Sequence, residues 1–317
     1  MLTRLLRCAC DVPSHCYTWS FEPKTDWSAT YASSKEIHQY FSDFAKKYDL
    51  YKYIKLRHEV NDAIWNSQSA QWGIKVFNAE TGETHTDFAH VLINAGGILN
   101  AWRYPPIPGI KDYKGTLVHS AAWDPNLDLK GMTVGLIGNG SSGIQILPAI
   151  KDQVKTLITF IREPTWVSPP VGQGFKEYTT EDKARFAADP KYHLETRREI
   201  EANMNDKFGV FHTGSTEQIQ TKTYMLSQMK AKLNNPGLED VLIPEWSVGC
   251  RRITPGTNYL ESLSASNVKV VYGEIDRITE KGCVVNGQEH DVGVLICATG
   301  FDTVSFCRDR EYWTNRI

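Results

Sequence analysis

The sequence lacks the features that mark membrane-spanning, disulfide-stapled and nucleic-acid-binding proteins. No apolar stretch in the 317 residues approaches the about 18 residues that a membrane-spanning helix needs. The seven cysteines are scattered and form no C-x-x-C pair, so neither a disulfide framework nor a zinc site is indicated. The 35 lysines and arginines nearly balance the 37 aspartates and glutamates, and no dense basic run occurs. We therefore expect no metal, no nucleic-acid partner and no spanning segment.

Residues 1–7 are basic and apolar, but the residues that follow interrupt this stretch before it reaches the length of a secretory signal. No internal repeat of the solenoid type occurs. We read the chain as a globular protein of a reducing compartment, the cytoplasm. The sequence does not indicate its oligomeric state.

The stretch 133–161 has the pattern of a βαβ unit that binds a dinucleotide. Apolar runs at 134–137 and 156–161 are typical of buried strands, and a segment with helical spacing separates them. After the first run comes a G-x-G-x-x-G motif, formed by Gly138, Asn139, Gly140, Ser141, Ser142 and Gly143. Its glycines allow a tight turn, close approach of a pyrophosphate, and close packing of helix and strand. Because the helix N-terminus would face the phosphates, we predict a dinucleotide site here.

Arg162 follows the second strand of this unit, where an acidic residue in an NAD site would bind the ribose 2′-hydroxyl. An arginine instead suits the 2′-phosphate of NADP, which a guanidinium can bind by a bidentate charged contact. The neighbouring Glu163 leaves an alternative open, because its carboxylate could neutralise Arg162 or select NAD. Arg162 could also be an ordinary solvated residue at a strand end. NADPH is the cofactor we predict.

Elsewhere the pattern predicts an α/β fold with a helical insertion. A turn-rich loop at 10–21 precedes a helix over 34–48, and a proline-rich crossover at 104–109 is the expected boundary between domains. The insertion over about 164–250 is polar and carries helices expected at 181–188, 193–208 and 216–233. Strands are expected at 54–60, 72–77, 90–97, 268–272, 277–279, 283–285 and 292–300, and near 116.

The residues directly before the glycine motif resemble the fingerprint of a known family. Residues 113–124, with His119 and Trp123, are similar to the F-x-G-x-x-x-H-x-x-x-W-(P/D) pattern of Baeyer–Villiger monooxygenases, with tyrosine in place of phenylalanine. Further resemblance to fungal members from polyketide and mycotoxin pathways lies at 10–17, 138–145, 160–166 and 297–302. The resemblance covers nearly the whole chain, from about residue 8 to residue 302.

This resemblance implies a flavoprotein with two dinucleotide-binding domains. It implies a partial FAD domain at 1–105, a Rossmann-like NADP domain at 106–290 and a return to the FAD domain at 291–317. The implied reaction uses FAD, NADPH and O₂ to insert oxygen beside a ketone carbonyl, which gives an ester or lactone in secondary metabolite biosynthesis. The protein's part in such chemistry is positioning and electrostatics. The sequence does not identify the ketone.

The resemblance also assigns roles to individual residues. Arg252 matches the catalytic basic position, and Arg251 matches a position that binds the 2′-phosphate. Asp11 matches an aspartate between flavin and nicotinamide, while Tyr17 and Val60 match flavin contacts. From the residues alone, the arginine pair could be merely solvated and Asp11 could form an Asx-turn. His119 is expected to be a buried, hydrogen-bonded structural residue.

The sequence departs from the family pattern in two places. The family has two dinucleotide motifs, of which the first binds FAD, whereas this sequence contains one. Residues 304–317 show neither helical nor strand periodicity. We therefore expect a truncated family member with an incomplete FAD domain. Two alternatives stay open: an inactive fragment that retains NADP binding, and an N-hydroxylating flavin monooxygenase, against which Arg252 and the fingerprint argue.

Overall fold

The computed structural model describes residues 9–169, 174–206 and 208–303, and the chain divides into two compact units. The first unit contains residues 1–40 and 104–300, and the second contains residues 41–103 and 301–317. This division differs from the ranges 1–105, 106–290 and 291–317, because the N-terminal residues group with the nucleotide-binding sheet. Which cofactor each range serves stays a prediction. The segment 304–317, expected to lack periodicity, lies outside the described residues.

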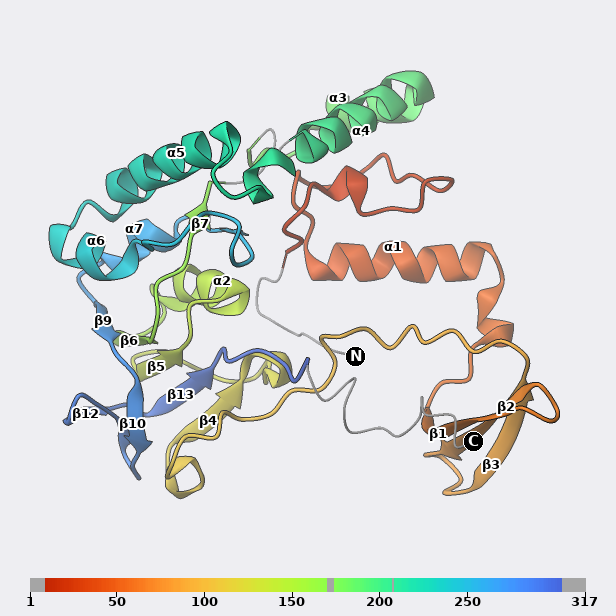
Figure 1. Ribbon diagram of the computed structural model, residues 1–317, viewed down its shortest axis with the longest axis horizontal. Coiled ribbons are helices and arrows are strands. Elements are labelled where there is room, and N and C mark those ends of the chain that lie inside the picture. The colour runs from red at the N-terminus through yellow and green to blue at the C-terminus, as the bar shows by residue number, and fades with distance from the viewer. Residues whose placement is uncertain (1–8, 170–173, 207, 304–317) are drawn as a thin grey trace. The chain divides into compact units, whose positions relative to one another are not determined.

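A five-stranded parallel sheet forms the centre of the first unit (Figure 1). Its order is β4-β13-β5-β6-β9, and every neighbouring pair runs parallel. The strands are β4 (Thr116–His119), β13 (Val294–Cys297), β5 (Thr133–Ile137), β6 (Thr156–Ile161) and β9 (Val268–Tyr272). Their apolar runs reflect burial on both faces, which is typical of parallel sheets. The predicted α/β fold is confirmed.

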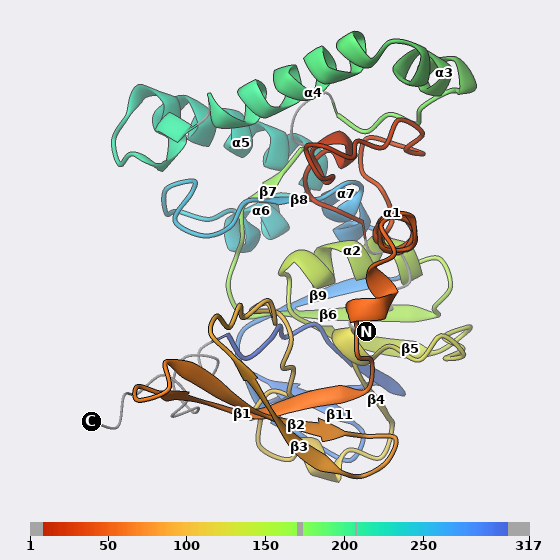
Figure 2. The same cartoon turned by 90° about the vertical axis from the view of Figure 1, so that its right-hand side faces the viewer.

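The two faces of this sheet carry different layers, because successive side chains of a strand point to opposite sides. Leu136, Leu157 and Ile296 pack into the cluster formed with helices α2 (Ser141–Ile150), α5 (Thr216–Leu233) and α7 (Tyr259–Leu263). Figure 2 shows α2 and α7 on this side of the sheet. Ile158, Phe160 and Leu295 pack on the other side against a small antiparallel sheet of β10 (Ile275–Ile278), β11 (Gly282–Val285) and β12 (Gln288–Asp291).

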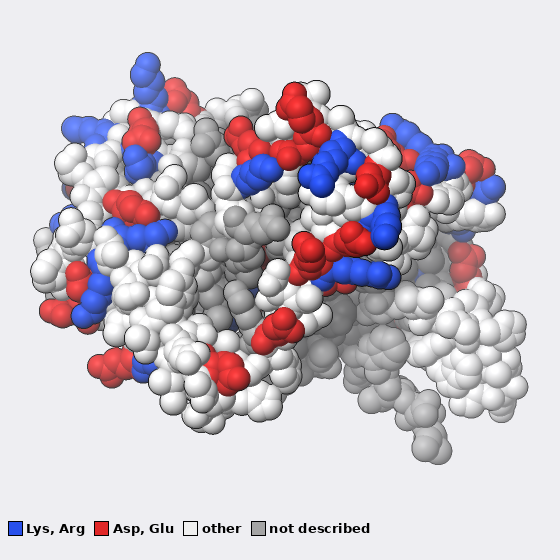
Figure 3. Space-filling model, turned by 90° about the horizontal axis from the view of Figure 1, so that it is seen from above, with Lys and Arg blue, Asp and Glu red and all other residues white. Residues whose placement is uncertain are grey.

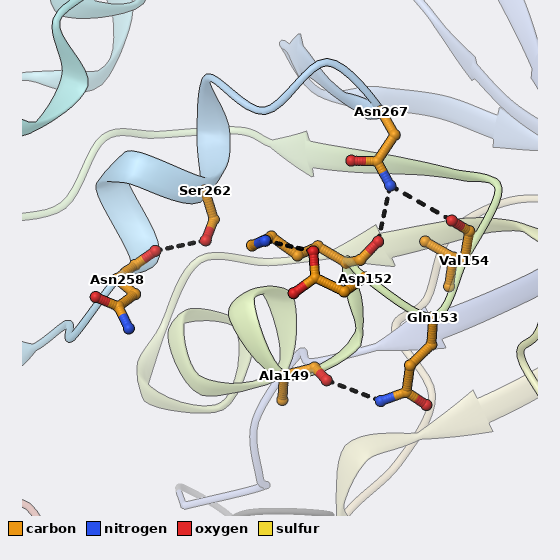
Figure 4. Close-up of polar contacts among 8 residues, drawn as sticks. Ala149, Asp152, Gln153, Val154, Asn258, Ser262 and Asn267 are labelled. Atoms are coloured by element: carbon orange, nitrogen blue, oxygen red, sulfur yellow. Dashed lines mark hydrogen bonds and ion pairs between the residues drawn. The ribbon is translucent and has the colours of Figure 1, made fainter.

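Hydrogen bonds tie the C-terminal end of α2 to the segment that enters β9. Asn267 Nδ2 donates to the carbonyl oxygens of Lys151, at 2.7 Å, and Val154, at 3.4 Å (Figure 4). Gln153 Nε2 donates to the Ala149 carbonyl at 2.9 Å, which closes the last turn of the helix. These contacts hold the C-terminal end of α2 at the edge of the sheet where the parallel strands begin. Its N-terminus therefore lies at the edge where β5 ends.

The expected helices of the insertion are present as α3 (Thr180–Ala188), α4 (Pro190–Asn205) and α5, and a short α6 (Pro236–Leu242) follows. A capping box formed by Thr179 and Asp182 begins α3. Helix α4 begins earlier than predicted, because Asp189 Oδ1 accepts from the Tyr192 N–H and Pro190 suits a first helical position.

On the face shown in Figure 3, the coloured lysines and arginines are interspersed with aspartates and glutamates.

Helix α1 (Ser34–Lys47) agrees with the predicted helix, and the second unit contains an antiparallel sheet of order β1-β2-β3. Strand β2 (Gln71–Asn78) agrees with its prediction, but the bounds 54–60 are wrong, because β1 spans His58–Asn66. The predicted range ended too early because a bulge between Val60 and Asp62 interrupts the alternation, although residues 62–66 pair regularly with β2. Strand β3 (Thr84–Ala89) was not predicted, since it is exposed and polar along most of its length.

The buried strand predicted at 90–97 is wrong. These residues form no strand, and Val91 and Ile93 are 75% and 82% exposed. An apolar run indicates a buried strand only where another strand is available to pair with it. No strand of the described residues pairs with 90–97, and Asn94 Oδ1 instead accepts from the Gly96 N–H at 3.0 Å.

The N-terminal loop is fixed within the first unit by a buried histidine pair. His15, 1% exposed, lies with its Nδ1 2.9 Å from His193 Nε2 on α4. Arg197 Nε donates to the His15 carbonyl at 3.2 Å, and the rings of Tyr178 and Phe186 contact the imidazole edge-on. Burial, and after it the charges of His193 and Arg197, lower the pKa of His15 from 6.5 to about 4. The neutral imidazole is therefore the form that this environment stabilises.

We expect the stability of the chain to fall as the pH falls from about 6.5 towards 4. The unfolded chain takes up a proton on His15 near pH 6.5 and the folded chain does not, so acid favours unfolding. The loss from His15 is at most about 3 kcal/mol. Urea unfolding at a series of pH values should show a flatter pH dependence for His15→Gln than for His38→Gln, which alters an exposed histidine. Identical pH profiles for both variants would contradict this account.

Candidate functional site

The glycine loop between β5 and α2 has the geometry of a phosphate-binding turn. Gly138 has a φ of +103°, and a Cβ there would lie 2.7 Å from the Ala298 carbonyl oxygen. A Cβ on Gly143 would lie 2.0 Å from the carbonyl oxygen of Gly138, so only glycine permits this approach of helix to strand. Gly140, by contrast, faces open space within 4 Å. It is the N-cap of α2, and no side chain caps this helix, so its first N–H groups are available to an anion.

The other motif residues tie this loop to the segments on either side of the insertion. Asn139 Nδ2 donates to the carbonyl oxygen of Glu163 at 2.9 Å, directly after β6. Ser141 Oγ lies 3.2 Å from Thr254 Oγ1 in β8 (Thr254–Pro255), which pairs in parallel with β7 (Val167–Ser168). Ser142 is half-buried in the first turn of α2. The loop therefore lies beside Glu163, after β6, and beside β8.

Arg251 and Glu163 form an ion pair at this place. Arg251 Nη1 donates to Glu163 Oε2 at 2.6 Å, and the guanidinium carbon lies 4.7 Å from the centre of the Trp246 ring. The hydrogen bond and charge of Arg251 hold the pKa of Glu163 below its usual value, and the nearby Arg162 lowers it further. Trp166 Nε1 donates to the Trp246 carbonyl at 3.1 Å, which fixes the main chain that carries the Trp246 ring. Arg162 itself is exposed at the end of β6.

Arg252, the next residue, pairs with Asp11 instead. One guanidinium nitrogen of Arg252 donates to a carboxylate oxygen of Asp11, although 241 positions separate the two residues. The loop with Asp11 also reaches α2, because the Ala9 N–H donates to Gln145 Oε1 at 3.2 Å. The pair stays accessible, since the Arg252 side chain is 71% exposed. The structure thus brings Asp11, Arg251, Arg252 and the glycine loop together within one unit.

The two residues expected to contact a flavin are not placed at this ion pair by any described contact. Tyr17 follows the 3₁₀ turn Ser14–Cys16, and its side chain is largely exposed, at 43%. Its main-chain N–H donates to the Ser14 carbonyl at 2.9 Å. Val60 lies on β1 in the second unit and is 48% exposed. Their roles stay predictions.

His119 and Trp123 lie inside the first unit. His119 is fully buried at the end of β4, and its Nδ1 accepts from the Ala121 N–H at 3.1 Å. Its Nε2 lies 3.5 Å from Thr299 Oγ1, just beyond β13, and burial lowers its pKa. Trp123 is 4% exposed and packs in the helix-side core. These positions agree with a structural rather than a proton-transferring histidine.

Sequence reasoning missed the residues that orient the two arginines. Trp246 gives no periodic signal, and nothing in the sequence pairs Glu163 with Arg251 rather than with the adjacent Arg162. Gln145 and His193 were likewise not identified as anchors of the N-terminal loop. Glu163 and Arg251 lie on opposite sides of the helical insertion, and 136 and 178 positions separate Gln145 and His193 from their partners in the N-terminal loop, so only the fold brings these pairs together.

Within the described ranges, no group of three or more histidine, cysteine, aspartate or glutamate side chains could hold a metal ion. In the same part of the chain, every helix is too short or too polar to cross a bilayer. The cysteines at positions 10, 16, 250, 283 and 297 are present as thiols.

Comparison with known proteins gives concordant matches in sequence and in structure. The model of the family described as flavin-binding monooxygenase-like matches residues 10–307. The FAD-binding monooxygenase tazF of Aspergillus terreus is 36% identical over 304 residues, which cover 93% of this chain and 54% of that protein. A Baeyer–Villiger monooxygenase of Streptomyces coelicolor is 31% identical over 298 residues, which cover 93% of this chain and 55% of that protein. The chain thus spans about half the length of the curated relatives it matches.

Solved structures of monooxygenases also match this chain. A cyclohexanone monooxygenase bound to epsilon-caprolactone superposes with a TM-score of 0.81 at 26% identity, over 96% of this chain and 66% of that one. A steroid monooxygenase bound to NADP superposes with a TM-score of 0.79 at 26% identity, over 93% of this chain and 63% of that one. Since the family model covers nearly all of the sequence, the chain belongs to the flavin-binding monooxygenase-like family.

Proposed function

We propose that this chain contains the NADPH-binding part of an FAD- and NADPH-dependent monooxygenase that oxidises a ketone to an ester or lactone. The observation that carries the proposal is the Asp11–Arg252 ion pair, which lies one residue from Arg251 and beside the glycine loop. Cyclohexanone and steroid monooxygenases among the matching structures, and Baeyer–Villiger monooxygenases among the relatives, support a ketone as the substrate class. A role in secondary metabolism rests on the resemblance of the sequence to fungal family members from polyketide and mycotoxin pathways, and fungal FAD-binding monooxygenases are among the relatives.

The residues of the glycine loop fit the pyrophosphate of NADPH. The uncapped N–H groups at the start of α2 would bind the phosphates, and the open space at Gly140 would leave room for them. Arg162 and Arg251 present two guanidinium groups near the end of β6, where the 2′-phosphate would bind. Asp11 and Tyr17 of the first unit would contact FAD, and the flavin contact expected of Val60 from the sequence resemblance stays a separate prediction. Because the sequence contains one glycine motif, the pyrophosphate of FAD needs a second cradle that the described residues do not provide.

In such an enzyme the reduced flavin supplies the electrons that activate O₂. The part that this chain plays is electrostatic. Arginine carries a positive charge, so Arg252 would stabilise negative charge that develops on oxygen during the reaction. Asp11 accepts a hydrogen bond from that guanidinium and holds it at the junction of the N-terminal loop and the segment before β8. Because this interaction acts only where charge develops, it favours the transition state over substrate binding.

We expect Gly140→Ala and Gly143→Ala to fail in different ways. A methyl group on Gly140 meets no protein atom within 4 Å but would project into the phosphate cradle, so folding should survive while NADPH and NADH both bind more weakly. A methyl group on Gly143 meets the Gly138 carbonyl at 2.0 Å and should destabilise the chain. Calorimetric titration and thermal unfolding of both variants separate the two effects. Unchanged cofactor binding by a folded Gly140→Ala variant would contradict the phosphate site.

Replacing Arg162 with alanine should weaken NADPH binding by about 1–3 kcal/mol, since it removes a charged hydrogen-bonding partner of the 2′-phosphate. NADH lacks this phosphate, so its affinity should barely change. Calorimetric titration with both nucleotides measures the difference. Arg198→Ala, at an exposed arginine on α4, serves as the control for the loss of one charge. Equal losses for both nucleotides would show that Arg162 is structural.

Arg252→Ala should leave almost no ester formation while NADPH oxidation continues, with the electrons released as hydrogen peroxide. This test uses the chain extended by the flanking segments of a longer relative, so that FAD binding is complete. Removal of one preorganised charge costs about 10²–10³ in rate. Rapid mixing with O₂ and product analysis on a panel of ketones would follow the separate steps. Normal ester formation would refute the role of Arg252, and exclusive hydroxylation of amines would favour an N-hydroxylating enzyme.

A further inference from the structure

The site expected to bind the 2′-phosphate already contains an anion of the protein itself. Glu163 Oε2 accepts a hydrogen bond from Arg251 Nη1 at 2.6 Å, slightly shorter than the about 2.7–2.9 Å of an ordinary charged N–H···O bond. The Glu163 side chain is 46% exposed and that of Arg251 is 56% exposed, so an incoming ligand can reach both groups. Asn139 of the glycine loop holds the Glu163 main chain at 2.9 Å, which keeps this residue at the end of the phosphate cradle.

A second contact holds the Arg251 guanidinium beside Glu163. The guanidinium lies 4.7 Å from the ring centre of Trp246, at a distance where cation–π attraction contributes. Trp246 is in turn anchored, because its carbonyl accepts a hydrogen bond from Trp166 Nε1. A phosphate that binds Arg251 must therefore displace the Glu163 carboxylate or approach the guanidinium beside it. In the first case the ion pair is lost, and in the second case the carboxylate repels a group that carries about −1.5 to −2 charges at pH 7.

We infer that Glu163 is a specificity-determining residue that competes with the 2′-phosphate of NADPH for Arg251, and so narrows the preference of this site for NADPH over NADH. The inference rests on the proposed function, because it assumes that the nucleotide binds at the glycine loop. The ribose of NADH carries a 2′-hydroxyl, which can donate a hydrogen bond to a carboxylate. The same residue thus opposes one nucleotide without opposing the other.

A specificity-determining Glu163 and a purely structural ion pair lead to different expected results. An exposed ion pair contributes little to stability, so Glu163→Gln should leave thermal unfolding almost unchanged. Its effect should instead appear in the affinity for ligands that carry a 2′-phosphate. Because the interaction is between exposed charges, that effect should shrink as salt is added.

The experiment compares 2′,5′-ADP with 5′-AMP, which share the adenosine and 5′-phosphate but differ in the 2′-phosphate. Calorimetric titration of Glu163→Gln should show 2′,5′-ADP binding about tenfold tighter than in the unaltered chain, with 5′-AMP unchanged or slightly weaker. The gain should be smaller in the Arg251→Ala background, where no pair exists to be broken. Glu199→Gln, at an exposed glutamate on α4, controls for the change in net charge.

Three outcomes would overturn the inference, and they can be told apart from failure of the proposed function. Unchanged 2′,5′-ADP affinity in Glu163→Gln, with a loss in Arg162→Ala, would refute the competition while the NADP site stands. Equal gains for 2′,5′-ADP and 5′-AMP would show a general charge effect. Absence of binding of both ligands to the unaltered chain would refute the NADP site and the inference together.

Discussion

The close approach of α2 to the end of β5 is the constraint on which the site depends. It is possible only because Gly143 has no side chain where the Gly138 carbonyl lies. The contact directs the uncapped N-terminus of α2 to the edge of the sheet where the parallel strands end. Residues 162–163 follow β6 at that same edge, and Asn139 of the glycine loop binds the Glu163 carbonyl. The contact of Gly143 with Gly138 therefore places the glycine loop beside these charged residues.

The second half of the site is supplied by segments that are distant in sequence. Arg251 and Arg252 are adjacent, yet they pair with different acids, Glu163 after β6 and Asp11 in the N-terminal loop. The loop is placed by the His15–His193 contact and by the Ala9–Gln145 hydrogen bond. The helical insertion therefore serves the site, because one of its helices anchors the loop that presents Asp11. In the function proposed above, the neighbouring guanidinium groups would have separate roles, Arg251 towards the nucleotide and Arg252 towards oxygen chemistry.

Prediction from sequence succeeded where local physics decides the outcome. The strand–glycine–helix order at 133–150 and the capped helices of the insertion depend on near neighbours, and they form as expected. Prediction failed at 90–97, where burial depends on strands elsewhere in the fold, and at β3, whose exposed residues give no pattern. The fingerprint at 113–124 indicated the family, but it could not show that His119 is held by a residue beyond β13.

The sequence by itself determined the dinucleotide motif, the α/β class and the resemblance to flavin monooxygenases, because glycine spacing and apolar periodicity are local properties of the chain. Only the tertiary structure decided the charge pairing. Glu163 is adjacent to Arg162 in sequence, but β6 and the segment before β8 bring it to Arg251 instead. Coulomb attraction acts through space and not along the chain, so the partner of each charge follows from the fold.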